Sequence, residues 1–442
     1  MTDRLVVVSD VHLAVPGPLN NFHAGDALAD FVAAQRVPNT TLVLAGDVFD
    51  FLQIPGRPER LRGDEMPALI ATTLDALAAT PWGERLFAAF GALLRTPGAR
   101  VVVTPGNHDP EVAHPAFATQ LLAKAGLPDG HPGLVVRADG VFRTRVGARD
   151  VVVAHGHRTD PWNDIAPATV AAALAGEDAP LPPGSRLVTR VLNAFKDARD
   201  DAGAPRFPFV DLLKPELPCV PLLLLYLDRA LAMEHLPDVL GLRVETFARS
   251  VAKALTGASL GLESAGPAPA PADDVARALA ATYSPSQRSN PGRVADELAT
   301  WLEEGDVGGL EGTLAPHGGM RARMLRAFLR AASDDGRFFD RTHRSEDCVA
   351  LARAHQPADA TPCAVIGGHT HAAREVWLSA EHVYLNTGTW TDLMAFPARL
   401  DDEALRTWID ALERREVPRV RHLTWAEVTP SAVGLHSLAP LP

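Results

Sequence analysis

The chain has 442 residues, of which 47% are hydrophobic and 22% are charged, and its formal net charge is −12. This length is enough for two or three domains, or for one domain that carries a large insertion. A general nucleic-acid-binding protein needs a clustered basic surface. The acidic balance, without a prominent Lys/Arg cluster, argues against nucleic acid and against an anionic membrane surface as partners.

Three widely spaced cysteines, Cys219, Cys348 and Cys363, form no CxxC pair, so neither a zinc knuckle nor a disulfide framework is indicated. Reduced thiols and a cytoplasmic location are the simplest expectation. The N-terminus lacks the pattern of a signal peptide. The longest apolar stretch, residues 217–227, contains two prolines and is about half as long as the ~20 residues that span a bilayer. We therefore predict no transmembrane segment.

Strand-like and helix-like segments alternate over the first 159 residues, which predicts an α/β sheet with crossover helices. The expected strands are Leu5–Ser9, Thr41–Ala45, Arg100–Thr104 and Asp150–Ala154. The expected helices are Gly25–Gln35, Met66–Leu94 and Glu111–Lys124. Leu134–Arg137, Val141–Val146 and the strand that follows them predict an antiparallel meander at the edge of the sheet.

Helical patterns prevail from residue 160 to residue 357. Residues 257–272 are rich in Gly, Pro and Ala, and this composition predicts a flexible loop. The apolar segment from Phe207 to Tyr226 fits either ordinary helix packing or an apolar lid or acyl-chain groove.

Strand patterns return after residue 358. The expected strands are Ala364–Gly367, Glu375–Leu378, His382–Leu385 and Thr389–Met394, and a helix over Asp402–Arg414 and two short strands follow. We therefore predict one α/β domain in two parts, residues 1–159 and 358–442. A mostly helical insertion at 160–357, a candidate cap or lid, interrupts it.

Five polar clusters each follow an apolar run. They are Asp10-Val11-His12, Gly46-Asp47-Val48-Phe49-Asp50, Gly106-Asn107-His108-Asp109, His155-Gly156-His157 and Gly368-His369-Thr370-His371. Sites in open α/β sheets gather at the carboxyl ends of strands, so we expect these clusters to converge. Alone, each cluster is explained as well by a turn or by a structural histidine. All five in order are not explained in that way.

The residue types in the clusters suit metal ions. Asp10 and His12 are two residues apart at the end of a strand, so we expect both to reach one ion. The carboxylate of Asp47 has two oxygens with which to bridge two cations, and Asn107 offers a neutral carbonyl oxygen. This set of nitrogen and oxygen donors suits Mn, Fe, Zn, Co or Ni.

The pattern DxH, GDxxD, GNHD, H and GHxH resembles the calcineurin-like metallophosphoesterase superfamily. The resemblance covers the α/β core and not the insertion, and it implies a two-sheet sandwich flanked by helices. It also implies two divalent or trivalent metal ions, with Mn, Fe or Zn expected. The implied ligands are Asp10, His12 and His371 for one ion and Asn107, His155 and His369 for the other, with Asp47 bridging both.

The implied reaction is hydrolysis of a phosphomonoester, phosphodiester or pyrophosphate by attack of a metal-bound hydroxide, because two cations about 3.5–4 Å apart lower the pKa of water. His108 would face the phosphate of a small-molecule or lipid-linked substrate, where an imidazole can protonate the leaving oxygen. Asp50 would orient the His108 ring.

Two neighbouring residues leave alternatives open. His157 would contact substrate or a ligand residue, or be structural, and Arg374 would meet a substrate phosphate or form a surface salt bridge. The Gly-Asp-Val-Phe-Asp-Phe run and the helical insertion are similar to UDP-2,3-diacylglucosamine hydrolases, although those usually have Arg in place of His108. This makes hydrolysis of a nucleotide-diphospho-sugar or of a lipid-linked pyrophosphate one alternative for the substrate. A non-catalytic binding module on the same fold is the alternative to an enzyme.

Overall fold

A computed structural model of the protein describes residues 2–203, 205–207, 210–214, 337–357, 361–395 and 402–438. The chain divides into two units. The first consists of Met1–Pro208, Arg337–Asp392 and Val420–Pro442, and the second of Phe209–Gly336 and Leu393–Arg419. Within the described ranges, every helix is too short or too polar to cross a membrane.

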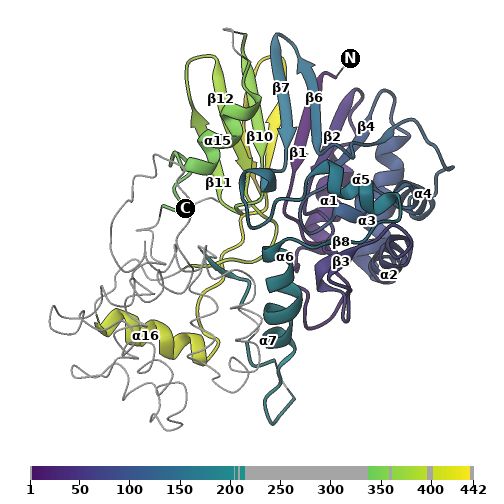
Figure 1. The fold of residues 1–442 in the computed structure, drawn as a ribbon. Helices are drawn as coiled ribbons and strands as arrows, with labels where there is room; N and C mark the ends of the chain where they lie inside the picture. The colour runs from purple at the N-terminus through teal and green to yellow at the C-terminus, as the bar shows by residue number, and fades with distance from the viewer. Residues whose placement is uncertain are drawn as a thin grey trace, which may run out of the picture. The chain divides into compact units, whose positions relative to one another are not determined.

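Two β-sheets form the centre of the first unit (Figure 1). One has the order β15-β14-β1-β2-β4-β5, and the other has the order β11-β12-β10-β7-β6. The first sheet consists of β1 (Arg4–Val8), β2 (Thr40–Ala45), β4 (Arg100–Thr104), β5 (Leu134–Val136), β14 (Thr424–Val428) and β15 (Val433–Ser437). The second consists of β6 (Val141–Val146), β7 (Arg149–Ala154), β10 (Cys363–Gly367), β11 (Ala373–Trp377) and β12 (His382–Thr387).

The central strands of each sheet run parallel: β1, β2, β4 and β5 in the first, and β7, β10 and β12 in the second. Their side chains alternate between two apolar environments. Val7 and Val43 pack with Val153 and Ile366 in the layer between the sheets, whereas the neighbouring Val8 packs in the outer layer. Burial on both faces explains why these strands are almost continuously apolar. The predicted two-sheet sandwich is confirmed.

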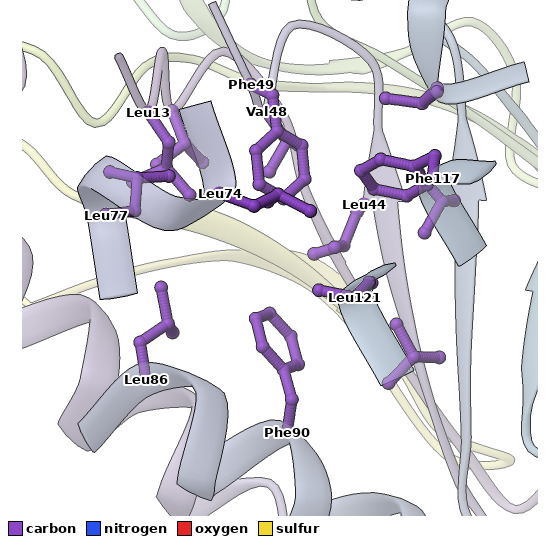
Figure 2. Packing of buried hydrophobic residues seen from close by; sticks show 14 of the residues in the cluster. Leu13, Leu44, Val48, Phe49, Leu74, Leu77, Leu86, Phe90, Phe117 and Leu121 are labelled. Atoms are coloured by element: carbon purple, nitrogen blue, oxygen red, sulfur yellow. The ribbon is translucent and has the colours of Figure 1, made fainter. Parts of the chain in front are cut away.

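Helices cover both outer faces. The first sheet carries α1 (Gly25–Ala34), α2 (Met66–Ala78), α3 (Pro81–Leu94) and α4 (Pro115–Lys124), and the second carries α15 (Glu346–His355). Figure 2 shows how the loop after β2 is anchored in the first of these layers. The ring of Phe49 meets that of Phe117 edge to face at 5.1 Å, and both are buried. The polar residues next to Phe49 are therefore held by the core.

Three expected elements differ from the structure. The helix predicted over Met66–Leu94 is two helices, because Thr80 accepts a hydrogen bond from Gly83 N and Pro81 begins α3. The predicted meander is wrong: β5 pairs in parallel with β4 in the first sheet, while β6 and β7 form a hairpin in the second. The strand predicted over Thr389–Met394 is reduced to β13 (Met394–Ala395), which pairs with β9 (Leu213–Lys214) in the second unit.

The segment after residue 160 begins within the first unit. It contains α5 (Pro167–Leu174), β8 (Ala179–Pro180), α6 (Pro183–Leu187), a π-helix η4 (Val188–Leu192) and α7 (Asn193–Asp197). Residues 160–208, predicted as part of the insertion, thus belong with the sandwich, and β8 pairs with β3 (Arg60–Leu61). Conversely, α16 (Asp402–Glu413), predicted in the core, belongs to the second unit.

Several expectations lie outside the described residues. They are the flexible loop at 257–272, the helices expected between residues 222 and 332, Cys219 and most of the apolar segment from Phe207 to Tyr226. The cap or lid role of the insertion stays a prediction. Cys348 and Cys363 are buried and form no disulfide.

Candidate metal centre

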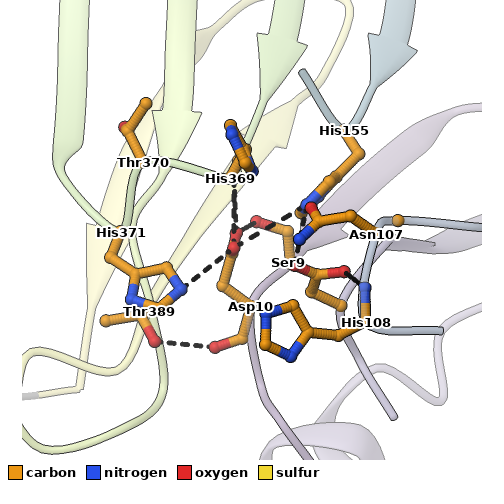
Figure 3. A network of polar contacts seen from close by, with 12 residues as sticks. Ser9, Asp10, Asn107, His108, His155, His369, Thr370, His371 and Thr389 are labelled. Carbon is orange, nitrogen blue, oxygen red and sulfur yellow. Dashed lines mark hydrogen bonds and ion pairs between the residues drawn. The ribbon is translucent and has the colours of Figure 1, made fainter. Parts of the chain in front are cut away.

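The five polar clusters meet where the parallel strands of both sheets end. Three short 3₁₀ helices lie beside them: η1 (Phe51–Gln53), η2 (Pro110–Ala113) and η3 (His157–Thr159). Figure 3 shows Asp10, Asn107 and His108 from the loops of the first sheet opposite His155, His369 and His371 from the second. Residues far apart in the chain therefore face one another across the ends of the two sheets.

The loops after β1 and β2 continue the pairing of their strands. The backbone N–H of His12 donates to the carbonyl of Asp47 at 3.0 Å, and Leu13 forms a bridge with Phe49. Asp10 and His12 do share one site, but the predicted reason, two residues on one face of a strand, is wrong. The strand ends at Val8, and both residues have a left-handed backbone, with φ of 51° and 56°.

Left-handed backbone recurs through the centre. Residues with φ between 51° and 70° include Asp10, His12, Asp47, His369 and His371. For a side chain other than glycine this conformation costs about 1–2 kcal/mol per residue. Such strain persists where surrounding contacts impose it, and it clusters at functional sites.

Asp10, His12 and His371 form the first group of side chains close enough to hold one ion. The Nε2 atom of His371 lies 3.4 Å from Oδ1 of Asp10 and 3.0 Å from Nε2 of His12. The other ring nitrogen of His12 lies 2.9 Å from the Asp50 carboxylate. Because a carboxylate accepts, His12 Nδ1 carries the proton and Nε2 of a neutral ring presents its lone pair to this group.

Asp47, His155 and His369 form a second such group. His155 Nδ1 donates to the carbonyl of Ala45 at 2.9 Å, and its Nε2 lies 3.1 Å from Oδ2 of Asp47. Burial opposes a charge on His155, but the carboxylates of Asp47 and Asp10 outweigh it and raise the pKa of His155 to about 9. A cation between these atoms would replace that proton.

Asn107 lies beside His155 of the second group (Figure 3). Its Oδ1 is buried and has no hydrogen-bond partner among the described atoms, whereas its Nδ2 donates to Asn163. A buried carbonyl oxygen without a partner costs free energy unless a cation or donor satisfies it. This oxygen, the carboxylates and the imidazole nitrogens match the donors that divalent transition metals prefer. The residues therefore fit a pair of metal ions.

His108 lies outside these two groups but forms a third one with His12 and Asp50 that could hold an ion. Its Nδ1 is 3.1 Å from Oδ2 of Asp50, the same oxygen that His12 approaches, and its side chain is 17% exposed. Burial raises the pKa of Asp50, but His108 and His12 outweigh that effect and hold this pKa below its ordinary value. An ionised Asp50 thus orients two imidazoles.

Asp109 belongs to the third polar cluster, but the sequence pattern did not reveal its structural role. Its carboxylate accepts backbone hydrogen bonds from Gly106 at 2.6 Å, Asp47 at 3.0 Å, Val48 at 2.9 Å and Phe49 at 3.2 Å. Burial and the nearby Asp47 carboxylate raise the pKa of Asp109 to about 7, against the effect of the N–H donors. Asp109 holds the loops after β2 and β4 together.

Two glycines leave room for ligand side chains. A Cβ on Gly106 would lie 2.1 Å from Oδ1 of Asp47, and a Cβ on Gly46 would lie 2.6 Å from Cγ of His155. Gly46 also has a φ of 80°, a conformation that side chains other than glycine rarely adopt. Both positions require glycine because ligand side chains occupy the space.

The family model of the calcineurin-like phosphoesterases matches residues 3–184, which include four of the five polar clusters. These residues are therefore similar to that family. The fifth cluster, which contains His369 and His371, lies beyond the match and is brought to the centre by β10. The search of curated proteins and the search of solved structures each found no match.

Calcineurin-like phosphoesterases are mostly metal-dependent hydrolases of phosphoesters and typically bind two divalent metal ions. The groups of His and Asp side chains in this centre that could hold a metal ion agree with that general property. The similarity to UDP-2,3-diacylglucosamine hydrolases stays a prediction.

The sequence also predicted roles for His157 and Arg374. His157 is buried, its ring centroid is 5.4 Å from that of His155, and burial together with His155 lowers its pKa to about 3. Arg374 is 5% exposed and donates to the carbonyls of Phe338 at 2.6 Å and Arg337 at 3.1 Å. Arg374 is therefore buried, which does not fit the alternative of a surface salt bridge, and a substrate role for either residue stays a prediction.

Proposed function

We propose that the protein is a dinuclear metal-dependent phosphoesterase that hydrolyses a phosphomonoester, a phosphodiester or a pyrophosphate. One observation carries the proposal: three groups of side chains that could hold a metal ion meet at this centre, and one of them brings the His108 imidazole beside His12 and Asp50. A centre that only binds a ligand would not need the additional imidazole of His108. The retained ligands also argue against a non-catalytic binding module.

In this proposal one ion is held by Asp10, His12 and His371, the other by Asn107, His155 and His369, and Asp47 bridges them. The first triad and the Asp47–His155–His369 group support this assignment, as does the buried Oδ1 of Asn107. Mn, Fe or Zn suits these donors. When bound, such a pair supplies positive charge for phosphate oxygens and lowers the pKa of water.

His108 is the proposed catalytic side chain. Because its Nδ1 faces the Asp50 carboxylate, we propose that Nε2 holds a proton toward substrate when the ring is protonated. A proton at that position can stabilise charge on the phosphate or pass to the leaving oxygen, which typically accelerates such reactions ~10²–10⁴-fold. Asp50 acts through His108 and His12 by fixing their rings.

The natural substrate is proposed to be a phosphorylated small molecule or a lipid-linked phosphate, encountered in the cytoplasm. A screen of manganese-loaded protein tests this across p-nitrophenyl phosphate, its bis-ester, cyclic nucleotides and nucleotide-diphospho-sugars. We expect cleavage of at least one class, and loss of that cleavage after the metal is removed. Failure to cleave any of them with two ions bound would contradict the proposal and favour the binding module.

A further inference from the structure

The segment just after the fourth cluster contacts two of the proposed ligands of the second ion. The Oδ2 atom of Asp160 lies 3.1 Å from Nε2 of His369. The same oxygen accepts a hydrogen bond from Nδ2 of Asn163 at 2.7 Å, and Oδ1 of Asp160 accepts one from the backbone N–H of Trp162 at 2.9 Å. The carboxylate is thus held by its own segment while it faces His369.

The contact decides which ring nitrogen of His369 is available. A carboxylate has no proton to donate, so Nε2 of His369 is the protonated nitrogen. In a neutral ring Nδ1 then carries the lone pair. A metal-binding histidine commonly donates its other N–H to a carboxylate, which fixes the ring and increases its basicity.

Asn163 makes the corresponding contact with Asn107. Its Oδ1 accepts a hydrogen bond from Nδ2 of Asn107 at 3.3 Å, which points the amide nitrogen of Asn107 outward. The buried Oδ1 of Asn107 is left without a hydrogen-bond partner among the described atoms. Asn163 therefore selects the oxygen of Asn107, and not its nitrogen, as the atom that faces the centre.

A third segment keeps this arrangement in place. Gly184 donates its backbone N–H to the carbonyl of Trp162 at 2.9 Å, and a Cβ on Gly184 would lie 2.2 Å from Oδ1 of Asn163. The next residue, Ser185, donates its hydroxyl to the carbonyl of Asn107 at 3.3 Å. Residues 160–163 and 184–185 therefore pack on the outer side of the second ligand set.

We propose that Asp160 and Asn163 are positioning residues for the second metal ion, in that they set the coordinating atoms of His369 and Asn107. The proposal rests on the proposed dinuclear centre and extends it to residues outside its ligands. The start of the segment predicted as an insertion thereby determines how tightly one of the two ions binds. The contacts given above for the first ligand set are with Asp50 and within the set itself.

The test is a titration of metal-free, full-length protein with Mn²⁺, followed by equilibrium dialysis and elemental analysis. Asp160→Ala and Asn163→Ala should each weaken one of two Mn²⁺ ions ~10–100-fold and leave the other unchanged. Excess Mn²⁺ should restore two ions per chain. The spin-coupled signal of a Mn²⁺ pair in electron paramagnetic resonance should weaken in parallel at limiting metal.

Asp164→Ala is the matched control. Asp164 lies in the same segment, pairs with Arg158 at 3.5 Å and has a side chain that is 43% exposed. It should bind both ions as the unmodified protein does. The melting temperature of each metal-free variant separates loss of positioning from loss of folding, and if Asp160→Ala does not fold, Asn163→Ala decides the question alone.

The outcomes separate this inference from the proposed function. Unchanged affinity for both ions in Asp160→Ala and Asn163→Ala would overturn the inference while hydrolysis by the unmodified protein stands. An equal loss in Asp164→Ala, or fewer than two ions in the unmodified protein, would also overturn it. Selective loss of one ion in a protein that cleaves no phosphoester would support the inference and contradict the phosphoesterase.

Discussion

The two ligand sets of the centre are supported by different parts of the chain. In the first set, Asp50 orients His12, and the backbone N–H of His369 donates to Asp10 at 3.0 Å, so both of these contacts come from the motifs themselves. In the second set, His369 and Asn107 are contacted by Asp160 and Asn163, which follow the fourth motif. The motifs thus contain the ligands of both ions, whereas these contacts to His369 and Asn107 come from residues outside the motifs.

Replacing Asp47 with Ala should have the largest effect, because this residue would be lost from both sets. We expect both ions to be released and phosphoester hydrolysis to fall by ~10³-fold or more, since several kcal/mol of transition-state stabilisation depends on the metal pair. Elemental analysis and the rate of cleavage of the bis-p-nitrophenyl ester measure the two effects. Asp26→Ala, at an exposed residue paired with Arg85, is the control. Retention of two ions by Asp47→Ala would remove Asp47 as the bridge.

Replacing His108 with Ala should leave both ions bound and slow turnover ~10²–10⁴-fold. If Nε2 of His108 protonates the leaving oxygen, an alkyl ester should lose more rate than a p-nitrophenyl ester, because p-nitrophenolate leaves without a proton. Equal losses would instead favour stabilisation of charge on the phosphate. Loss of an ion would place His108 among the ligands, and an unchanged rate would remove it from the mechanism.

Part of this site was predictable because strand ends are local features. Valine-rich runs that are buried on both faces mark β1, β2, β4 and β7, and the polar residues follow each run directly. The sheet to which a strand belongs, in contrast, does not follow from the local sequence. The strand β5 has a pattern that suits pairing with either β4 or β6, and only the tertiary packing decides for β4.

The same limit applies to the loops of the centre. The left-handed backbone of His12 depends on pairing with the loop of Asp47, which the spacing of Asp10 and His12 does not express. The contact between Asp160 and His369 joins residues 209 positions apart, and no sequence motif contains both residues. Side-chain pairs of this kind become visible only in the folded chain.

Replacing Asp50 with Asn tests whether the first ligand set is supported separately from the second. We expect the affinity of one ion to fall ~10–100-fold, because His12 loses its charged hydrogen-bond acceptor. Turnover should fall as well, because His108 loses the same acceptor. Mn²⁺ titration should show that Asp50→Asn and Asp160→Ala weaken different ions, so that the double variant binds both ions weakly. Loss of the same ion in both variants would mean that the two sets are not supported separately.

Replacing Arg374 with Gln should have the smallest effect on hydrolysis. Its guanidinium donates to the carbonyls of Phe338 and Arg337, so we expect the free energy of unfolding to fall by about 2 kcal/mol while kcat and KM stay unchanged. Denaturant unfolding and steady-state kinetics measure these quantities. Arg145→Gln, at an exposed residue, is the control. A KM that rises about tenfold without loss of stability would instead assign Arg374 to substrate.

The location of the ions tests the central claim most directly. Anomalous diffraction from crystals of Mn²⁺-loaded protein should show two peaks, one among Asp10, His12 and His371 and one among Asn107, His155 and His369, with Asp47 in contact with both. A single peak, or peaks elsewhere in the protein, would contradict the dinuclear centre.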